Sequence, residues 1–430
     1  MSEVRRVEVD YLARVEGEGS MKVLVRDGTI EEVEFGIFEP PRFFEAFMVG
    51  RQFTEAPDIT ACICGICPIA YQMSSVHAME DACGVTVDGQ LRELRRLIYC
   101  GEWIESHGLH IYLLHAPDFL GYESAVHMAA DHRELVEQGL QLKKVGNDIV
   151  TLVGGREIHP INVKVGGFYK LPAKADLEAL VPKLEWAREA ALKTVEVVAG
   201  FDYPDIEIDY EFVSVCHPDE YPFSEGNLVS NRGIDVPASE FNHVFTEEHV
   251  ERSNALQSRV IERGAYHVGP MARYALNYDK LPDSAKKAAA SVGLGEVCLN
   301  PFKSIIVRAV EMVFACEEAL RIIEGYDDSG PASVPVEPRA GVGHGATEAP
   351  RGMLYHRYEI ADDGSIVTAQ IAPPTAQNQL IIENDLRVVL QDNLHLADDD
   401  LSWRLEQSIR NYDPCISCAT HFLKLEIDRG

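Results

Sequence analysis

Two Cys-x-x-Cys pairs, one near each end of the chain, constrain the fold more than any other feature. Cys64 and Cys67 lie in the stretch CGIC, and Cys415 and Cys418 lie in DPCISCATH. A pair with this spacing can present two thiolates to one metal ion. Zinc ribbons keep their two pairs within roughly 12–20 residues of each other, whereas here almost the whole chain lies between them. If the pairs share a metal, the fold must bring both ends of the chain together and bury the C-terminal pair.

The composition is that of a globular protein. The chain has 430 residues, of which 46% are hydrophobic, and a formal net charge of −30. Such an acidic balance argues against a nucleic-acid surface, which needs clustered Lys and Arg. No apolar stretch approaches the roughly 18 residues of a membrane span, and the N-terminus shows no signal-peptide core. We therefore expect a cytoplasmic chain, in which ten cysteines are more typical of metal ligands and core residues than of disulfides.

Helical periodicity dominates the middle of the chain. Apolar residues recur at helical spacing in three stretches: 91–116, 132–152 and 301–325. Pro182 starts or interrupts a further helix within 174–200. We predict a helical core over 61–330.

Alternating apolar and polar residues predict β-structure near both ends. One such stretch covers 5–38, inside an N-terminal segment, 1–60, that we expect to be rich in strands. An irregular and β segment with the C-terminal metal-site helices should cover 331–421. Irregular chain over 327–352 should lead into this segment, followed by a hairpin turning at Asp363-Gly364 and two helices that end near Asp413. The predicted fold class is α+β, predominantly helical.

Four thiolates alone would suit zinc or an iron–sulfur cluster. The chain, however, resembles the large subunit of nickel–iron hydrogenases from about residue 8 to residue 421. Six motifs occur in the family's order: ARVEGE, PRFFEAF, CGIC, GGREIHP, GATEAPRG and DPCISCATH. The resemblance implies a central helix bundle with small peripheral sheets. It also implies reversible heterolytic cleavage of dihydrogen into protons and electrons.

The resemblance assigns the four cysteines to a nickel–iron centre. Cys64, Cys67, Cys415 and Cys418 would bind nickel, and Cys67 and Cys418 would also bridge to an iron that carries carbonyl and cyanide ligands. The terminal thiolate Cys415 would take the proton released by cleavage. Glu16, in RVEGE, would pass this proton outward.

Further residues of the motifs would surround the centre. Arg351 would hang over its open face and pair with Asp413. The prolines at the matching positions would line the pocket for carbonyl and cyanide: Pro350, Pro373 and Pro374. His159, in GGREIHP, is a family marker that we interpret as structural.

A second cation site is implied close by. Glu45 and His421 match the side chains that hold a buried divalent cation, expected to be magnesium, and the backbone carbonyl near Gln370 would be its third protein ligand. Magnesium favours such a site while it retains several waters.

Three positions depart from the commonest family pattern. Cys62 replaces an arginine, Tyr71 replaces a histidine that bonds a bridging sulfur, and Ser106 replaces an aspartate near the arginine, followed by His107 and His110. These changes affect groups around the ligands and leave the four ligands unchanged. We interpret Cys62 as a small buried residue, and we expect five other cysteines in the core: Cys83, Cys100, Cys216, Cys298 and Cys316.

Electrons need partners, because the chain has no further cysteine-rich cluster motif. The resemblance implies an iron–sulfur small subunit and, for NAD(P) coupling, flavin and iron–sulfur diaphorase subunits. A deazaflavin-coupled or heterodisulfide-coupled relative stays open. The stretch GVGHGA formally fits a dinucleotide motif, but prolines precede it and TEAPRG follows it where a strand and a helix are required.

Two other classes share part of these features. One is the quinone-site subunit of respiratory NADH dehydrogenase, which lacks the nickel thiolates; the other is a structural zinc protein, which would not need Glu16 or Glu45.

In the hydrogenase family a maturation endopeptidase cuts just after the histidine that His421 matches. The extension 422–430 would then be removed.

Overall fold

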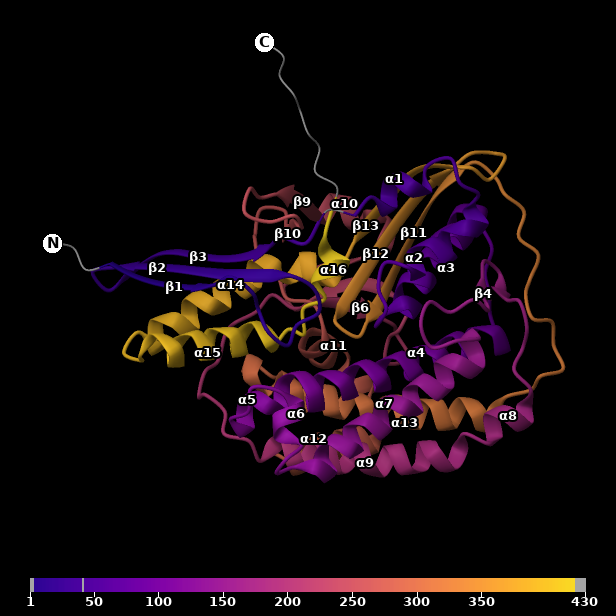
Figure 1. Cartoon of the computed structure of the whole chain (residues 1–430). Coiled ribbons are helices and arrows are strands. Elements are labelled where there is room, and N and C mark those ends of the chain that lie inside the picture. The colour runs from indigo at the N-terminus through magenta and orange to yellow at the C-terminus, as the bar shows by residue number, and fades with distance from the viewer. Residues whose placement is uncertain (1–3, 41, 422–430) are drawn as a thin grey trace, which may run out of the picture.

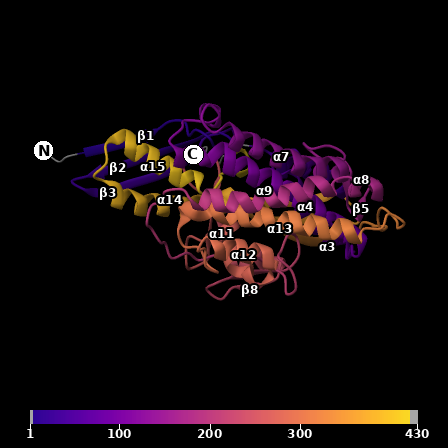
Figure 2. The same cartoon turned by 90° about the horizontal axis from the view of Figure 1, so that it is seen from below.

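Four long helices form one layer of the structure. The computed structural model describes residues 4–40 and 42–421. Within it α4 packs against α7 and α13, and α13 packs against α9 (Figures 1 and 2). Their bounds are α4 Gln90–Leu109, α7 Arg133–Gly154, α9 Val181–Ala199 and α13 Ser304–Gly325. All four helices predicted from periodicity are therefore confirmed, including the helix start at Pro182, which occupies the first turn of α9.

The predicted helix over 91–116 continues beyond α4 in a different winding. A π-helical segment, η2 (His110–His115), follows α4 and leads into α5 (Ala116–Leu120). A short 3₁₀ turn, η5 (Pro301–Lys303), begins at Pro301 and precedes α13. The remaining helices are α1 Phe44–Met48, α2 Ala56–Ala61, α3 Pro68–Cys83, α6 Ala125–Met128, α8 Lys174–Glu178, α10 Phe241–Val244, α11 Pro270–Asn277 and α12 Asp283–Ser291. Short 3₁₀ turns are η1 Phe53–Glu55, η3 Ala238–Glu240 and η4 Tyr278–Lys280.

The N-terminal β-structure is an antiparallel meander, as predicted over 5–38. Its strands are β1 Val4–Val9, β2 Gly19–Arg26 and β3 Thr29–Ile37, in the order β1-β2-β3. This ribbon lies along α14 (Pro374–Asn393) and α15 (Asp398–Arg410), the two C-terminal helices that were predicted (Figure 1). The ribbon β1–β3 and the helices α14 and α15 thus form one packed unit.

The second antiparallel sheet corrects one prediction. Its strands are β11 Gly341–Ala349, β12 Gly352–Ile360 and β13 Ile366–Ala372. The hairpin at Asp363-Gly364 is confirmed, but irregular chain over 341–349 is wrong. The glycines of this strand made the sequence look irregular, but they are required by the contact with α3. A Cβ at Gly343 would lie 1.9 Å from the carbonyl oxygen of Ala78. The glycines of GVGHGA therefore allow a strand to approach a helix closely.

Short strands also interrupt the region predicted as a helical core. They are β4 Val163–Lys164, β5 Gly167–Phe168, β6 Val213–Cys216, β7 Asn227–Ser230, β8 Asp235–Val236, β9 Phe245–His249 and β10 Leu256–Val260. They form two antiparallel pairs, β4-β5 and β9-β10, and the sheet β6-β7-β8. Runs of two to five residues are too short for a period-two pattern to stand out, so the sequence did not predict them.

One large apolar core joins the N-terminal ribbon, the helical layer and the C-terminal helices. A smaller cluster lies between β6, β10 and the β11–β13 sheet. The last described helix, α16 (Ile416–Ala419), lies at the meeting point of these parts (Figure 1). Within residues 4–40 and 42–421, no helix is long and apolar enough to cross a membrane.

Candidate metal centre

The two cysteine pairs meet in the interior. One sulfur from each of Cys64, Cys67, Cys415 and Cys418 lies within 4.8 Å of all the others, and all four residues are buried. The Sγ–Sγ distances are 3.5 Å for Cys64–Cys415, 3.9 Å for Cys67–Cys418 and 2.7 Å for Cys415–Cys418. Among the described residues, no other three His, Cys, Asp or Glu side chains bring their ligand atoms within 4.8 Å of one another. The expectation that the fold joins the chain ends at one site is met.

Local structure holds each pair in place. Cys64 lies in the turn between α2 and α3, and Cys67 caps the N-terminus of α3, with Pro68 in its first turn. The backbone amides of Ile66 and Cys67 both donate to Cys64 Sγ at 3.3 Å. Amides at a helix start stabilise a thiolate.

The C-terminal pair is fixed by the N-terminal ribbon. Cys415 and Glu16 form a parallel β-bridge, and the amide of Ile416 donates to the carbonyl of Glu16 at 2.8 Å. The amide of Cys415 donates to Thr375 Oγ1, at the start of α14. His421 continues this anchoring, because its amide donates to the carbonyl of Asn254. The described chain is therefore tied down at its C-terminal end.

The thiols require compensating positive charge. Hydrogen bonds from Cys415 and from the other two thiols lower the pKa of Cys64 well below its usual range. Burial raises the pKa of Cys415 and raises that of Cys418 to about 11. Four ionised sulfurs this close together are stable only beside cations. The donor set, four soft sulfurs, fits nickel and iron.

Arg351 supplies one such charge. Its Nε donates to the backbone carbonyl of Asp413 at 2.7 Å, and its Nη2 lies 3.2 Å from Asp413 Oδ1, with both side chains buried. Burial lowers the pKa of Arg351, but Asp413 and the thiolates outweigh it and raise the pKa well above normal. Nη1 has no hydrogen-bond partner among the described residues. The predicted pair exists, and one donor stays available.

Arg273, which the sequence analysis missed, holds the chain just before Arg351. Its guanidinium donates to the carbonyls of Ala349 and Pro350 and pairs with Glu311 and Glu348, all of them buried. The Trp103 ring lies 4.3 Å from this guanidinium. No spacing rule marks such a residue, because its partners come from distant segments.

Glu16 lies against the thiol of Cys415. Its Oε2 lies 3.0 Å from Cys415 Sγ and accepts a hydrogen bond from the amide of Ser417 at 3.0 Å. This is hydrogen-bond contact, which proton transfer requires. Glu16 itself lies in a loop before β2 and keeps its place through the bridge to Cys415.

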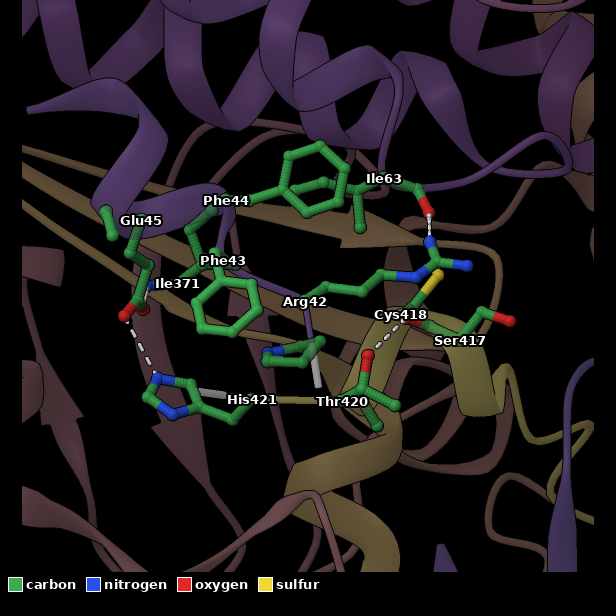
Figure 3. A pocket seen from close by; sticks show the side chains of 13 residues that line it. Arg42, Phe43, Phe44, Glu45, Ile63, Ile371, Ser417, Cys418, Thr420 and His421 are labelled. Carbon is green, nitrogen blue, oxygen red and sulfur yellow. Dashed lines mark hydrogen bonds and ion pairs between the residues drawn. The ribbon is translucent and has the colours of Figure 1, made fainter. Parts of the chain in front are cut away.

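Glu45 and His421 also come together (Figure 3). His421 Nε2 lies 3.0 Å from Glu45 Oε2, and Glu45 Oε1 accepts from the amide of Ile371 at 2.7 Å. Both line a cavity of about 100 Å³ that reaches Cys418 and Pro373. Gln370 precedes Ile371, so the structure brings the third predicted ligand residue to the same place.

A second carboxylate near this pair escaped the sequence analysis. Gln370 Nε2 donates to Glu247 Oε2 at 3.2 Å, and Glu247 Oε1 is buried without a partner among the described residues. Burial raises the pKa of Glu247 to about 7, whereas the charge of His421 opposes this rise. A buried carboxylate oxygen without a partner, near a second carboxylate, Glu45, and the imidazole of His421, fits a divalent cation.

The remaining predicted residues lie around the centre. Pro350, directly after β11, and Pro374, the first residue of α14, are both buried. His159 has a structural contact, because its Nδ1 lies 2.7 Å from the carbonyl oxygen of Ala61. Tyr71 reaches the carbonyl of Cys418 rather than a sulfur, at 3.4 Å.

The positions around Ser106 and Cys62, which depart from the commonest family pattern, differ in burial. Ser106, His107 and His110 are buried, and the two histidines bond Glu311 and the Arg410 carbonyl. Cys62 is exposed, which corrects our interpretation of it as buried; it ends α2, on the outer side of the turn. Of the cysteines predicted in the core, Cys216 is half-buried and the others are buried.

Comparison with known proteins agrees with this geometry. A model of the family described as nickel-dependent hydrogenase matches residues 42–141 and 257–421, more than half of the chain. Sulfhydrogenase 1 subunit alpha of Pyrococcus furiosus is 33% identical over 427 residues, covering 97% of this chain and 98% of its own. The NAD-reducing hydrogenase HoxS subunit beta of Cupriavidus necator is 25% identical, with coverage of 97% and 95%.

Solved structures show the same fold. An NAD+-reducing [NiFe]-hydrogenase in the H2-reduced state superposes with a TM-score of 0.88 at 26% identity, covering 97% of this chain and 99% of that one. A [NiFeSe] hydrogenase from Desulfovibrio vulgaris Hildenborough, 22% identical, superposes with a TM-score of 0.80, covering 97% and 100%.

A helical α+β fold around four buried thiolates defines the catalytic subunit of a metal-dependent oxidoreductase. The chain belongs to the nickel-dependent hydrogenase family, as its large subunit. Hydrogenase relatives along the full length, together with all four thiolates, decide against the two alternatives, a quinone-site subunit and a structural zinc protein.

Proposed function

We propose that this chain cleaves dihydrogen heterolytically at a nickel–iron centre bound by Cys64, Cys67, Cys415 and Cys418. The observation that supports this best is the set of four buried sulfurs within 4.8 Å. When bound, nickel and an iron with carbonyl and cyanide ligands supply the Lewis acidity and redox capacity that splitting dihydrogen needs. The four thiolates would hold the metals, and Cys67 and Cys418 would each contribute to holding both nickel and iron.

The chain's own groups handle the proton. Cys415 takes it on its sulfur, and Glu16, whose Oε2 is 3.0 Å away, accepts it next. Arg351 directs a charged donor at the centre and is held by Asp413. Pro350, Pro373 and Pro374 keep the surroundings apolar, which strengthens these charge interactions by excluding water.

A magnesium ion close by is the second part of the proposal. Glu45 and His421 would bind it with side chains and Gln370 with its backbone carbonyl. The contact between Glu45 and His421, and the extra carboxylate of Glu247, support a cation here. This ion would stabilise the segment from Cys418 to His421, because both residues line the same cavity as Glu45.

Electrons would leave to an iron–sulfur small subunit. The chain exposes large apolar residues in one stretch before α2, namely Phe38, Phe43, Phe47 and Val49; patches of this kind mark partner surfaces. The NAD-reducing relative favours NAD(P) as final acceptor, reached through flavin and iron–sulfur diaphorase subunits. Hydrogen-dependent NAD(P) reduction by the complex purified through this chain tests the coupling; reduction of a deazaflavin instead would contradict it.

We also propose that a maturation endopeptidase removes Phe422–Gly430. These residues lie outside the described part of the structure. His421, the last residue before them, contacts Glu45, so removal after His421 would leave that contact intact. Mass spectrometry of active enzyme tests this, and an intact Gly430 would rule out obligatory cleavage.

Substitution of the proton-accepting thiol tests the central reaction. Cys415→Ser should abolish hydrogen uptake, because an alkoxide at this position is a much poorer nickel ligand and proton acceptor than a thiolate. Cys216→Ser is the matched control, since Cys216 is half-buried beside Ser214, away from the cluster. Full hydrogen uptake in Cys415→Ser would contradict the proposal.

A further inference from the structure

A second carboxylate, Glu39, lies just beyond Glu16 and is connected to it through Ser417. Ser417 Oγ lies 2.7 Å from both Glu39 Oε1 and Glu39 Oε2. The amide of the same serine donates to Glu16 Oε2, the oxygen in contact with Cys415 Sγ. One residue of the DPCISC motif therefore joins two carboxylates from the N-terminal region.

The geometry suits proton transfer in sequence. A serine hydroxyl donates one hydrogen bond and accepts others at the same time, so Ser417 can take a proton on one side while it releases one on the other. Glu16 Oε1 has no hydrogen-bond partner among residues 4–40 and 42–421. Ser417 Oγ contacts Glu39 and not Glu16 in this structure, so transfer from Glu16 requires the carboxylate to turn Oε1 toward Ser417 Oγ.

Gly17 makes this close arrangement possible. A Cβ at Gly17 would lie 2.5 Å from Glu39 Oε2 and 2.8 Å from the amide nitrogen of Ser417. Its φ of +87° is also one that residues with a Cβ rarely adopt. The residue next to Glu16 is thus a glycine over which the second carboxylate packs.

Glu39 also connects the buried centre with solvent. Cys415 is 1% exposed, whereas the Glu39 side chain is 15% exposed. Glu39 and Ser417 line a cavity of about 680 Å³ together with Tyr11, Arg14, Gly17 and Glu18. Arg42 Nη2 donates to Glu39 Oε1 at 3.1 Å and holds the carboxylate in place.

We propose that Ser417 and Glu39 form the next steps of the proton route, from Glu16 to this solvent-facing cavity. The inference rests on the proposed function, in which Glu16 receives the proton of Cys415. Glu16 then protonates Ser417 Oγ while the Ser417 hydroxyl gives its own proton to Glu39, and Glu39 releases it to solvent. Each step moves one proton, breaks and makes one X–H bond, and needs no oxidant or reductant.

Isotope exchange separates this route from the cleavage step itself. Exchange of D2 with H2O requires proton passage between the centre and solvent, whereas conversion of para-hydrogen to the equilibrium mixture requires only reversible cleavage inside the site. Both would be measured by anaerobic gas analysis on the purified complex of Glu39→Gln and Ser417→Ala, with Glu16→Gln for comparison. Ser417→Ala removes the hydroxyl but keeps the amide that holds Glu16.

The matched control is Glu18→Gln. Glu18 lines the same cavity, but its side chain bonds Tyr11 and not Ser417. We expect Glu39→Gln and Ser417→Ala to slow D2–H2O exchange by about 10² or more, the usual contribution of a positioned acid–base group, with para-hydrogen conversion retained. Glu18→Gln should exchange like the unsubstituted complex.

Three results would overturn parts of this account, and they are distinguishable. Unchanged exchange in Glu39→Gln and Ser417→Ala, with exchange blocked in Glu16→Gln, would remove the Ser417–Glu39 route and leave the proposed function intact. Loss of para-hydrogen conversion together with exchange would also overturn the route, because the two residues would then act on the centre itself. A natural complex with neither reaction would refute the proposed function.

Discussion

At the scale of single residues, the interaction of Arg351 with Asp413 depends on the shape of the guanidinium as well as on its charge. Two nitrogens reach the carbonyl and the carboxylate of one residue, and a lysine ammonium cannot reproduce this fork. We expect Arg351→Lys to lower kcat for hydrogen oxidation by roughly 10²–10³, the usual cost of a misplaced charge at a reacting centre. Dye-linked hydrogen uptake measures this.

The control for that substitution lies on the same sheet. Arg357, on β12, contacts Thr368 at the surface, so Arg357→Lys should leave the rate unchanged. Nickel content should stay normal in both variants. A normal kcat in Arg351→Lys would show that the guanidinium fork is dispensable.

Asp385 gives the stability of the chain a defined pH dependence. Burial raises its pKa to about 7, although the hydroxyls of Tyr210 and Tyr412 donate to it. A raised pKa means that the folded state binds the proton more tightly. The stabilisation is thus complete below the unfolded pKa of about 4 and is lost as the pH rises through about 7.

Asp385→Asn removes this titration. The thermal midpoint of the natural chain should fall relative to that of the variant as the pH rises from 4 to 8. The corresponding loss in free energy of unfolding is at most about 4 kcal/mol. Calorimetry of the metal-free chains at several pH values measures the difference. A difference between the two midpoints that stays constant with pH would refute the assignment.

Residues inside local motifs could be predicted, and residues defined by distant contacts could not. Glu16, Glu45, Arg351 and His421 each stand in a short recognisable stretch, and the structure brings them to the cluster or beside it. Glu247 is linked to the proposed cation site by a hydrogen bond from Gln370, which lies on another strand. Nothing in the sequence around Glu247 reveals a partner so far along the chain.

At the scale of elements, the contact of β11 with α3 positions the first cysteine pair, since α3 begins just after Cys67. A Cβ at Gly345 would lie 2.3 Å from the carbonyl oxygen of Ser74, and one at Gly343 would lie closer still to Ala78. We expect Gly343→Ala and Gly345→Ala to destabilise the fold by about 1–3 kcal/mol through overpacking, and to reduce nickel content.

The same strand supplies the control. Val342 is 42% exposed, so Val342→Ala should change stability by less than about 0.5 kcal/mol and leave nickel content unchanged. Thermal unfolding and metal analysis of the three variants measure both effects. Normal stability and nickel content in Gly343→Ala would contradict the steric argument.

Elements with strong periodicity were predictable, and elements shaped by their neighbours were not. The apolar repeats of α7 and α13 match the buried faces of those helices. β11 was missed because its glycines, unfavourable in an isolated strand, are required by the nearby helix. Cys62 is likewise exposed because the turn after α2 presents its side chain to solvent. The sequence does not show which side of a turn faces solvent.

At the scale of the whole molecule, the centre joins the two ends of the chain. The C-terminal segment 413–421 contacts the N-terminal ribbon at Glu16, α14 at Thr375 and the loop at Asn254. Because metal ligands come from both ends, metal binding should be coupled to the order of this segment. Metal-free chain should therefore show faster amide hydrogen exchange over 413–421 than metal-loaded chain.

The helical layer is the internal reference for that experiment. α9 contains none of the proposed ligands, so exchange over Val181–Ala199 should be the same with and without metal. Equal exchange over 413–421 in the two forms would mean that the C-terminal segment is ordered independently of the centre.

The most direct test of the central claim is metal analysis of the purified complex combined with its infrared spectrum. If the four thiolates hold a nickel–iron centre, the chain contains nickel and iron in equal amounts at this site, and the spectrum shows the stretching bands of carbonyl and cyanide bound to iron. These bands disappear in Cys67→Ser, since Cys67 is one of the sulfurs proposed to bridge to iron. Zinc in place of nickel, with no such bands, would contradict the account.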